Sequence, residues 1–160
     1  TTPDIMCLAK GIAGGIPMGA TLVKSDILSV MKKGEHSSTF GGNPVSCAAG
    51  TATIQALTQD NLLKNAVMMG EKLFQGLTEM KSKHSIIREV RGKGLMIGVE
   101  LKFEVKDILL EGIKNGLLLL YSGRNILRFL PPLVISDEDV TNTLQILDKL
   151  LTNEEGRKNV

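Results

Sequence analysis

The sequence predicts an α/β protein, and three observations carry this prediction. Short apolar runs of strand length, such as residues 4–8 and 117–121, alternate with longer amphipathic segments. Glycine-rich stretches separate the elements in the first part of the chain. An apolar content of 42% is enough for a hydrophobic core, and 22% charged residues do not indicate disorder. A chain of 160 residues has room for one domain, or for part of a domain with a small lobe.

The first part of the chain predicts strands and glycine loops. Residues 4–8 predict a buried strand of the parallel kind, because the four residues after Asp4 are all apolar. A glycine-rich loop over 11–20 leads into a second strand at 21–25. Ser25 is expected to be the N-cap of a helix over 26–33.

A longer helix is expected over residues 44–57. Asn43 is a good N-cap, and Pro44 suits the first helical position because its missing N–H would have no intrahelical partner there. The small residues 46–50 suit close packing of this helix against a neighbour.

Beyond Asp60 the pattern changes to that of a smaller α+β lobe. We therefore place a domain boundary near residues 60–63, with domains over 1–60 and 61–160. The first expected elements are a helix over 62–83 and two strands within 86–102 joined by the turn 91–94; the helix has an apolar face formed by Leu63, Ala66, Val67, Leu73, Leu77 and Met80. A helix over 105–115, ended by Gly116, and two strands within 117–135 around the turn 122–125 are expected next. The last elements are a helix from the cap Ser136 to Leu151 and a frayed tail over 153–160.

Composition argues against several classes of function. The net charge is only +2, and the Lys and Arg residues are scattered along the sequence. The chain has only four phenylalanines and one tyrosine as aromatic residues, so no nucleic-acid partner is expected. No apolar run has the length of a membrane span, so no membrane partner is expected. Cys7 and Cys47 form neither a metal-ligand spacing nor a disulfide framework, which favours a cytoplasmic location.

Lys10 directly follows the first predicted strand and precedes Gly11. In α/β sheets the ligand crevice lies beyond the carboxyl ends of the strands. A lysine among apolar neighbours there would be partly desolvated, and its neutral amine could attack a carbonyl to form a Schiff base. The alternative is an ordinary solvated surface lysine.

The stretch HSSTFGGNPVSCAAG, residues 36–50, places hydroxyls and glycines before a helix start. Thr39 offers a hydroxyl, and Gly41 and Gly42 let backbone N–H groups approach a ligand closely. The N-terminus of the following helix favours negative charge, so the pattern suits a phosphate. The alternative is a capped helix with a glycine turn and no ligand.

Arg128 lies within the apolar run NILRFLPPL, residues 125–133. A buried arginine is costly unless an anion pairs with it, and a carboxylate matches its planar fork. The alternative is an arginine at a strand edge that points into solvent. Arg91 is interpreted as a turn residue without a ligand.

LAKGIAGGIPMGA, HSSTFGGNPVSCAAG and NILRFLPPL, taken together and in this order, resemble the class III aminotransferases of the fold-type-I superfamily. The similarity extends over nearly the whole chain. Within this family, the three motifs are most similar to those of the acetylornithine aminotransferases and of relatives that act on carrier-bound lysine. The resemblance implies pyridoxal 5′-phosphate as cofactor, with the first domain as the end of the large domain and the second as the small C-terminal domain.

The resemblance also implies roles for residues. Lys10 would bind the cofactor and move the proton, Thr39 would bind the cofactor phosphate of the neighbouring subunit, and Ser38 would face the substrate. Arg128 would bind the substrate carboxylate. Because Thr39 would serve the partner's site, a homodimer is expected. His36 is expected to have a structural or interface role.

The expected reaction moves the ω-amino group of a basic amino-acid derivative to 2-oxoglutarate, in arginine or lysine biosynthesis. The alternatives are a 4-aminobutyrate or ornithine aminotransferase, and a non-catalytic fragment. A glutamate-semialdehyde aminomutase is a further rival, which TFGGNP and RFLPP disfavour.

The family pattern also has an aspartate for the pyridine nitrogen, an aromatic residue on the ring and a phosphate loop upstream of the lysine strand. We find no match for them here, and the chain opens with TTPDIMCLAK and not with Met. We therefore expect a fragment equivalent to about the last two-fifths of a family member, inactive by itself.

Overall fold

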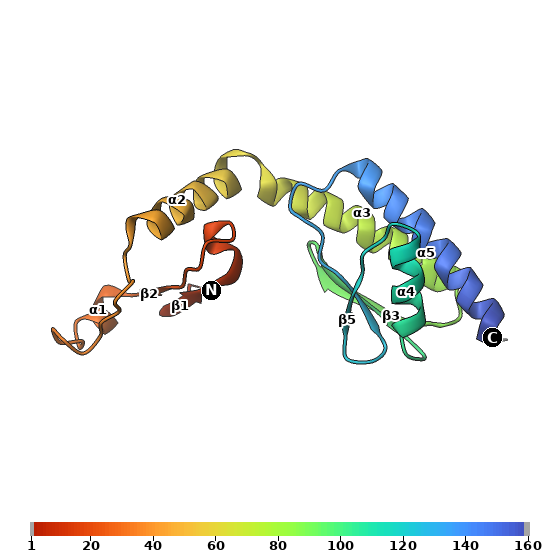
Figure 1. Ribbon diagram of the computed structural model, residues 1–160, viewed down its shortest axis with the longest axis horizontal. Coiled ribbons are helices and arrows are strands. Elements are labelled where there is room, and N and C mark those ends of the chain that lie inside the picture. Colours follow the sequence, from red (N-terminus) through yellow and green to blue (C-terminus); the bar gives the residue numbers. More distant parts are fainter. Residues whose placement is uncertain (1, 159–160) are drawn as a thin grey trace. The chain divides into compact units, whose positions relative to one another are not determined.

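A computed structural model describes residues 2–158 of the chain (Figure 1). It divides into two compact units, Thr1–Asn61 and Leu62–Val160, which are described separately below.

The first unit begins with a two-stranded antiparallel pair. Strand β1 (Ile5–Leu8) pairs with β2 (Ala20–Val23), with Ile5 opposite Val23 and Leu8 opposite Ala20. The expectation of a buried, parallel strand is therefore wrong for the described residues. The two strands bond to each other in antiparallel register, and no other described element covers them, so the side chains of Ile5 and Leu22 are about half exposed (53% and 52%).

A short 3₁₀ helix, η1 (Lys10–Ala13), follows β1, and α1 (Ser25–Leu28) follows β2. The predicted helix over 26–33 is wrong in its cap and its length. Lys24 holds the cap position without a side-chain hydrogen bond, and Ser25 is the first helical residue. The hydroxyl of Ser29 donates to the Asp26 carbonyl at the point where the helix ends.

Helix α2 (Pro44–Gln59) begins as the sequence predicts. The Oδ1 atom of Asn43 accepts a hydrogen bond from the backbone N–H of Ser46 at 2.9 Å, and Pro44 is the first helical residue. The helix ends two residues beyond the predicted Leu57.

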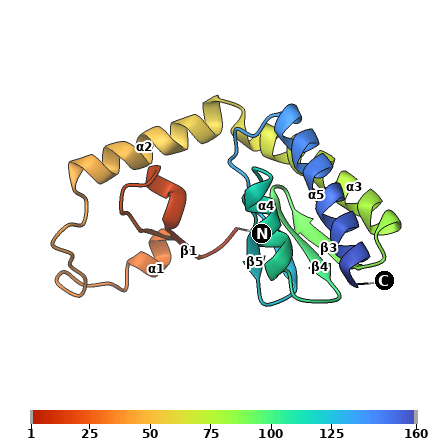
Figure 2. The same cartoon turned by 45° about the vertical axis from the view of Figure 1, so that its right-hand side comes forward.

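The second unit is an antiparallel sheet covered by helices on one face. The strands are β3 (Ile87–Lys93), β4 (Met96–Leu101), β5 (Leu120–Ser122) and β6 (Ile126–Phe129), in the spatial order β3-β4-β6-β5. The helices are α3 (Leu62–Lys83), α4 (Lys106–Lys114) and α5 (Asp137–Lys158). Figure 2 shows α3 and α5 lying side by side over the sheet.

One hydrophobic core joins the sheet and the helices of this unit. Alternate residues of β4 and β6, such as Val99 and Leu127, are fully buried against Leu77 of α3 and Leu147 of α5. The residues between them in each strand point to the opposite face of the sheet. Each strand therefore has one core face and one outer face.

The apolar face predicted for α3 is correct at Leu73, Leu77 and Met80 but wrong at Leu63 and Val67, which are 59% and 53% exposed. The sheet ends beside this first part of the helix, because the tip of the β3–β4 hairpin lies against Gly70.

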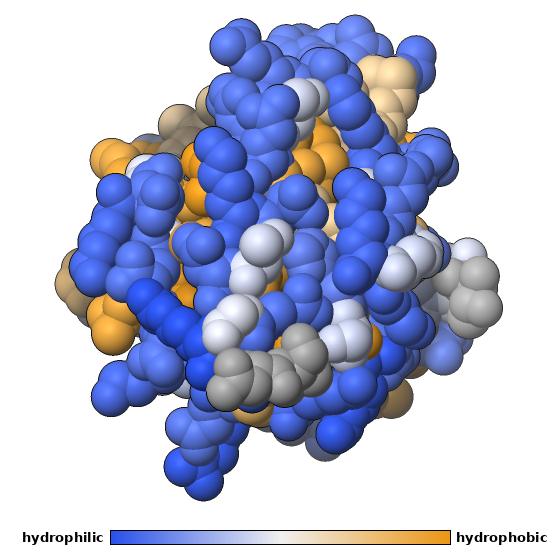
Figure 3. Space-filling model, turned by 90° about the vertical axis from the view of Figure 1, so that its right-hand side faces the viewer, coloured by the Kyte–Doolittle hydropathy of each residue, from blue (hydrophilic) through white to orange (hydrophobic). Residues whose placement is uncertain are grey.

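The side of the molecule that carries the C-terminal end of α5 is largely hydrophilic, as Figure 3 shows.

The β3–β4 turn and the end of α5 differ from the expectations. The β3–β4 turn consists of Gly94 and Leu95, because Lys93 and Met96 are still paired. Arg91 is therefore a strand residue. Helix α5 continues to Lys158, so the described part of the expected frayed tail is helical, while residues 159–160 lie outside the described residues.

The cap of α5 agrees with the sequence. The hydroxyl of Ser136 accepts from the backbone N–H of Asp139 at 3.1 Å, and the Asp139 carboxylate accepts from the Ser136 N–H at 2.9 Å. Across residues 2–158, no helix has the length and apolar content needed to cross a membrane.

His84, which the sequence pattern did not single out, is buried between α3 and α5. Its Nδ1 lies 2.9 Å from Oε2 of Glu155 and its Nε2 lies 2.8 Å from Oδ1 of Asp148. Burial lowers the pKa of His84, but the hydrogen bonds to Asp148 and Glu155 raise it by more, so the pKa is raised. Burial likewise raises the pKa of Glu155, but the hydrogen bonds from His84 and the Ile86 amide lower it by more.

These shifts predict how stability depends on pH. The contribution of His84 to the free energy of unfolding is complete below its ordinary pKa of 6.5 and is lost as pH rises through the raised pKa. The contribution of Glu155 is present above its ordinary pKa of 4.5 and is lost as pH falls through the lowered pKa. His84→Gln should lower the free energy of unfolding by about 1–3 kcal/mol near pH 6 and remove the alkaline decline. Urea unfolding followed by circular dichroism between pH 5 and 9 checks this, with His36→Gln, in an exposed loop, as control; an unchanged decline in His84→Gln would contradict the assignment.

Gly70 allows α3 to approach the β3–β4 hairpin closely. A Cβ atom on Gly70 would lie 2.5 Å from the backbone carbonyl of Gly94, and Gly94 itself has a positive φ of 55° that disfavours other residues. Gly70→Ala should therefore lower the free energy of unfolding by about 1–3 kcal/mol because backbone atoms must move apart. Gly156→Ala, in open space on α5, is the matched control and should be neutral or stabilising; equal thermal midpoints for the two variants would show that the close approach is not needed.

Candidate active site

Lys10 occupies the predicted place directly after β1, as the first residue of η1. Its φ is +57°, a left-handed conformation that is uncommon for residues other than glycine and often found at functional sites. The amine has no hydrogen-bond or ion-pair partner among residues 2–158. The side chain is exposed, so the desolvation expected from apolar neighbours is not provided by the described residues.

The glycine loop after Lys10 packs on α2. The hydroxyl of Ser46 donates to the carbonyl of Pro17 at 3.3 Å. A Cβ on Gly50 would lie 2.9 Å from Sδ of Met18, and one on Gly14 would lie 3.3 Å from Oγ1 of Thr53. Small residues of α2 therefore hold the loop that follows Lys10. The predicted close packing of residues 46–50 is confirmed at Ser46 and Gly50.

The turn before α2 holds Ser38 and Thr39. The backbone N–H of Gly41 donates to the carbonyl of Ser38 at 3.2 Å, and a Cβ on Gly41 would lie 3.0 Å from Cβ of Ser38. Gly42 has a φ of +70°. Both positions thus require glycine, and the turn brings the hydroxyl side chains to the surface ahead of the helix N-terminus.

The hydroxyls of Ser38 and Thr39 are exposed and make no hydrogen bond to any described residue. Asn43 ties the turn to the helix, because its Nδ2 donates to the carbonyl of Phe40 at 3.0 Å while its Oδ1 caps the helix. The hydroxyls of Ser38 and Thr39 and the amine of Lys10 are therefore available to a ligand. These groups fit pyridoxal phosphate, which has an aldehyde for an amine and a phosphate for hydroxyl and N–H donors.

Arg128 lies in β6 of the second unit and is half-buried. Gly98 of β4 and Leu120 of β5 are its register partners on either side. No carboxylate of residues 2–158 pairs with its guanidinium. The guanidinium is therefore available to an anion, and the side chain is partly buried, not fully buried as a costly unpaired arginine would be.

Two cavities of the second unit are lined by Arg128. One, of about 250 Å³, is apolar and is formed mainly by Leu117–Leu120 and by Pro131 and Pro132. The other is an open groove of about 300 Å³ on the outer face of the sheet. A carboxylate is suited to the groove and not to the apolar cavity.

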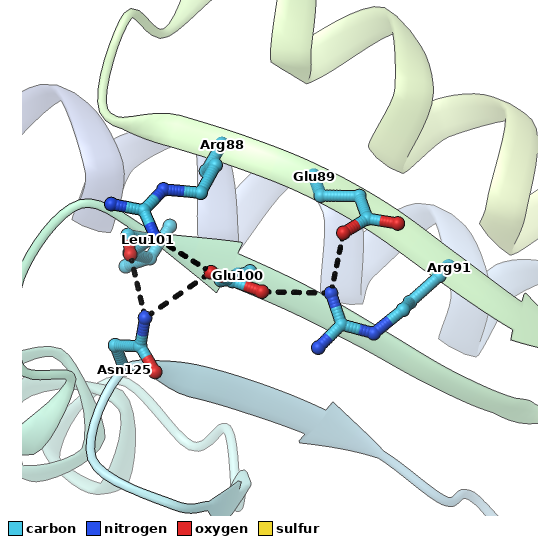
Figure 4. Close-up of polar contacts among 6 residues, drawn as sticks. All are labelled: Arg88, Glu89, Arg91, Glu100, Leu101 and Asn125. Carbon is cyan, nitrogen blue, oxygen red and sulfur yellow. Dashed lines mark hydrogen bonds and ion pairs between the residues drawn. The ribbon is translucent and has the colours of Figure 1, made fainter.

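A polar network on the outer face was missed by the sequence analysis (Figure 4). Glu100 of β4 accepts hydrogen bonds from Arg88 at 3.0 Å and from Arg91 at 2.8 Å. Arg91 also bonds to Glu89 at 2.7 Å. The hydrogen bond from Arg91 lowers the pKa of Glu100, against the opposing effect of burial.

The interpretation of Arg91 as a turn residue is therefore wrong, because it is a strand residue whose guanidinium pairs with Glu89 and Glu100. The hairpin register sets Arg91 opposite Gly98 and Glu89 opposite Glu100, so that the charges meet across the strands. Period-two alternation places Glu89 and Arg91 on one face of β3, but only the register shows which residue of β4 they meet.

The class III aminotransferase family matches this chain over residues 1–151. An acetylornithine aminotransferase of Caldanaerobacter subterraneus subsp. tengcongensis is 45% identical over 151 residues, which are 94% of this chain and 38% of that protein. Ornithine aminotransferase 1 of Staphylococcus saprophyticus is 38% identical over 152 residues, which are 94% of this chain and 38% of that protein.

Solved structures agree with these sequence matches. The ornithine δ-aminotransferase of Plasmodium falciparum has a TM-score of 0.91 and 34% identity, covering 98% of this chain and 42% of that one. The acetylornithine aminotransferase of Elizabethkingia anophelis has a TM-score of 0.90 and 33% identity, covering 96% and 42%. The chain thus spans about two-fifths of the length of these relatives.

These matches confirm the predicted α/β fold of the fold-type-I transferases and indicate pyridoxal phosphate as the cofactor. The motifs on which the resemblance depended all lie inside the matched residues 1–151. The chain belongs to the class III aminotransferase family.

Proposed function

We propose that this chain is part of an aminotransferase that moves the ω-amino group of acetylornithine or of a carrier-bound lysine to 2-oxoglutarate, in arginine or lysine biosynthesis. The observation that carries the proposal is the free amine of Lys10, held in a left-handed conformation at the end of β1. The 45% identity to a protein named acetylornithine aminotransferase supports the substrate.

Lys10 is the proposed catalytic residue, and its amine both binds the cofactor and transfers the proton. Pyridoxal phosphate supplies the electron sink when it is bound. The exposed amine has no competing carboxylate among the described residues, so it can move between these two tasks. The packing of its loop on Ser46 and Gly50 supports a fixed starting position for the amine.

Thr39 is proposed to bind the cofactor phosphate of a second subunit, and Ser38 to face the substrate. Their exposed, unpaired hydroxyls and the nearby N-terminus of α2 support these roles. A homodimer is proposed with them, because one chain would not complete its own site. On this reading residues 1–60 belong to the cofactor-binding large domain and 61–160 form the small domain.

Arg128 is proposed to bind the substrate carboxylate with its guanidinium fork. Its half-buried position beside a groove, without an acidic partner in the described chain, supports this role. Cys7 and Cys47 are free and exposed, which supports a reducing compartment such as the cytoplasm.

An ornithine aminotransferase is the second candidate. Relatives that carry this name are 38% identical in sequence or have a TM-score of 0.91. Steady-state rates with acetylornithine and ornithine as competing donors would separate the two.

Lys10→Ala should abolish the near-visible absorption band of the bound cofactor in the full-length enzyme and lower the turnover number by at least about 10²-fold, since the proton-transfer group is lost. Lys33→Ala, an exposed lysine of the same unit, is the control and should leave both unchanged. An unaltered band in Lys10→Ala would overturn the assignment.

Arg128→Lys should raise the KM for 2-oxoglutarate by about 10- to 100-fold, because a bidentate charged contact is replaced by a single ammonium. The affinity for pyridoxal phosphate should stay the same. Arg124→Lys, in the same hairpin and 85% exposed at its side chain, is the matched control. Equal losses of substrate and cofactor affinity in Arg128→Lys would indicate a structural role instead.

A further inference from the structure

The outer face of the β3-β4-β6-β5 sheet carries an open groove. The core-facing residues of these strands, such as Val99 and Leu127, point towards the helices, so the residues between them line the other face. The view in Figure 4 is onto this face, with the helices behind the sheet. The groove of about 300 Å³ lies here and is formed within the second unit alone.

Arg91, Gly98 and Arg128 form one row across this groove. Arg91 is opposite Gly98 in the β3–β4 register, and Gly98 is opposite Arg128 in the β4–β6 register. Neighbouring strands lie about 4.8 Å apart, so the two arginine Cα atoms are separated by about 10 Å. The residue between them in this row has no side chain, and all three residues line the groove.

The two arginines are not equivalent. The Arg91 guanidinium is held by Glu89 at 2.7 Å and by Glu100 at 2.8 Å. Arg128 has no such partner within residues 2–158. An anion in the groove consequently meets one guanidinium that is already paired and one that is not. Lys93, whose ammonium has no carboxylate partner within residues 2–158, also lines the groove.

The backbone conformation does not require a glycine at position 98, because the φ angle of Gly98 is not positive, unlike that of several other glycines of this chain. A Cβ atom at this position would lie 3.3 Å from Cγ2 of Ile126, which also lines the groove. One added methyl group would therefore narrow the groove that Gly98, Ile126 and Arg128 line.

We propose that Gly98 is a specificity-determining residue, which keeps open the space through which a carboxylate of the substrate reaches the Arg128 guanidinium. Ile126 lies beside this space, and Arg91, which Glu89 and Glu100 hold, also lines the groove. The proposal rests on the carboxylate role proposed for Arg128. It adds that the width of the groove at Gly98 decides whether a carboxylate can enter.

Nuclear magnetic resonance of the 160-residue chain labelled with ¹⁵N-arginine tests this. The probes are sodium 2-oxoglutarate and sodium acetate, added at constant ionic strength, and the Arg128 Nε–H resonance is assigned with Arg128→Lys. The wild-type resonance should shift and saturate. Gly98→Ala should weaken binding by about tenfold or more, and Gly98→Val should abolish the shift.

Two further variants separate filling of the groove from damage to the sheet. Gly98→Ala/Ile126→Ala should restore binding to within about threefold of wild type, because the side chain against which the new methyl group packs is gone. Gly156→Ala, in open space on α5, should bind as wild type does. Failure of the double variant to recover would attribute the loss to distortion and overturn the proposal.

The outcomes also separate this proposal from the role of Arg128. If wild type shows the shift and Gly98→Ala binds equally well, Gly98 does not control access, while Arg128 remains a carboxylate ligand. If the wild-type Arg128 resonance does not respond to either anion, the carboxylate role is contradicted and this proposal falls with it.

Discussion

The covering of a single face of the β3-β4-β6-β5 sheet is the constraint on which the second unit depends. Burial of alternate residues such as Ile97, Val99 and Leu127 against α3 and α5 provides its main stabilising free energy. Because side chains alternate strictly along a strand, the same register that buries these residues turns Gly98, Glu100 and Arg128 to the outer face. A slip of one residue would exchange the core for the polar face, so the packing of the core also fixes the groove.

Charge on this outer face is distributed by pairing. Arg88 and Arg91 are held by carboxylates, and this pairing lowers the pKa of Glu100. These exposed pairs contribute little to stability individually. Their effect is positional, since they leave Arg128 as the guanidinium of the row that retains its binding capacity. The proposed function thus depends on a contrast between two arginines that lie in one row across the sheet.

The first unit is held together differently, because its strands are exposed and its packing depends on small residues of α2. Ser46, Gly50 and Thr53 recur on one side of α2, and the glycine loop after Lys10 packs there. The left-handed conformation of Lys10 begins this loop. The relatives are more than twice as long as this chain, which accords with the absence of a covering layer over β1 and β2 among the described residues.

Local patterns of spacing and residue type were enough to predict the family, the order of most elements, the caps at Asn43 and Ser136, and the four residues on which the proposed chemistry depends. Folding was needed to show that β1 is antiparallel and exposed, that Arg91 pairs with Glu89 and Glu100, and that His84 lies buried between two carboxylates. Each of these depends on which strand or helix lies beside another. Residues such as Glu100 and Arg91, or His84 and Glu155, meet only after folding, and one sequence carries no local signal of such distant pairing.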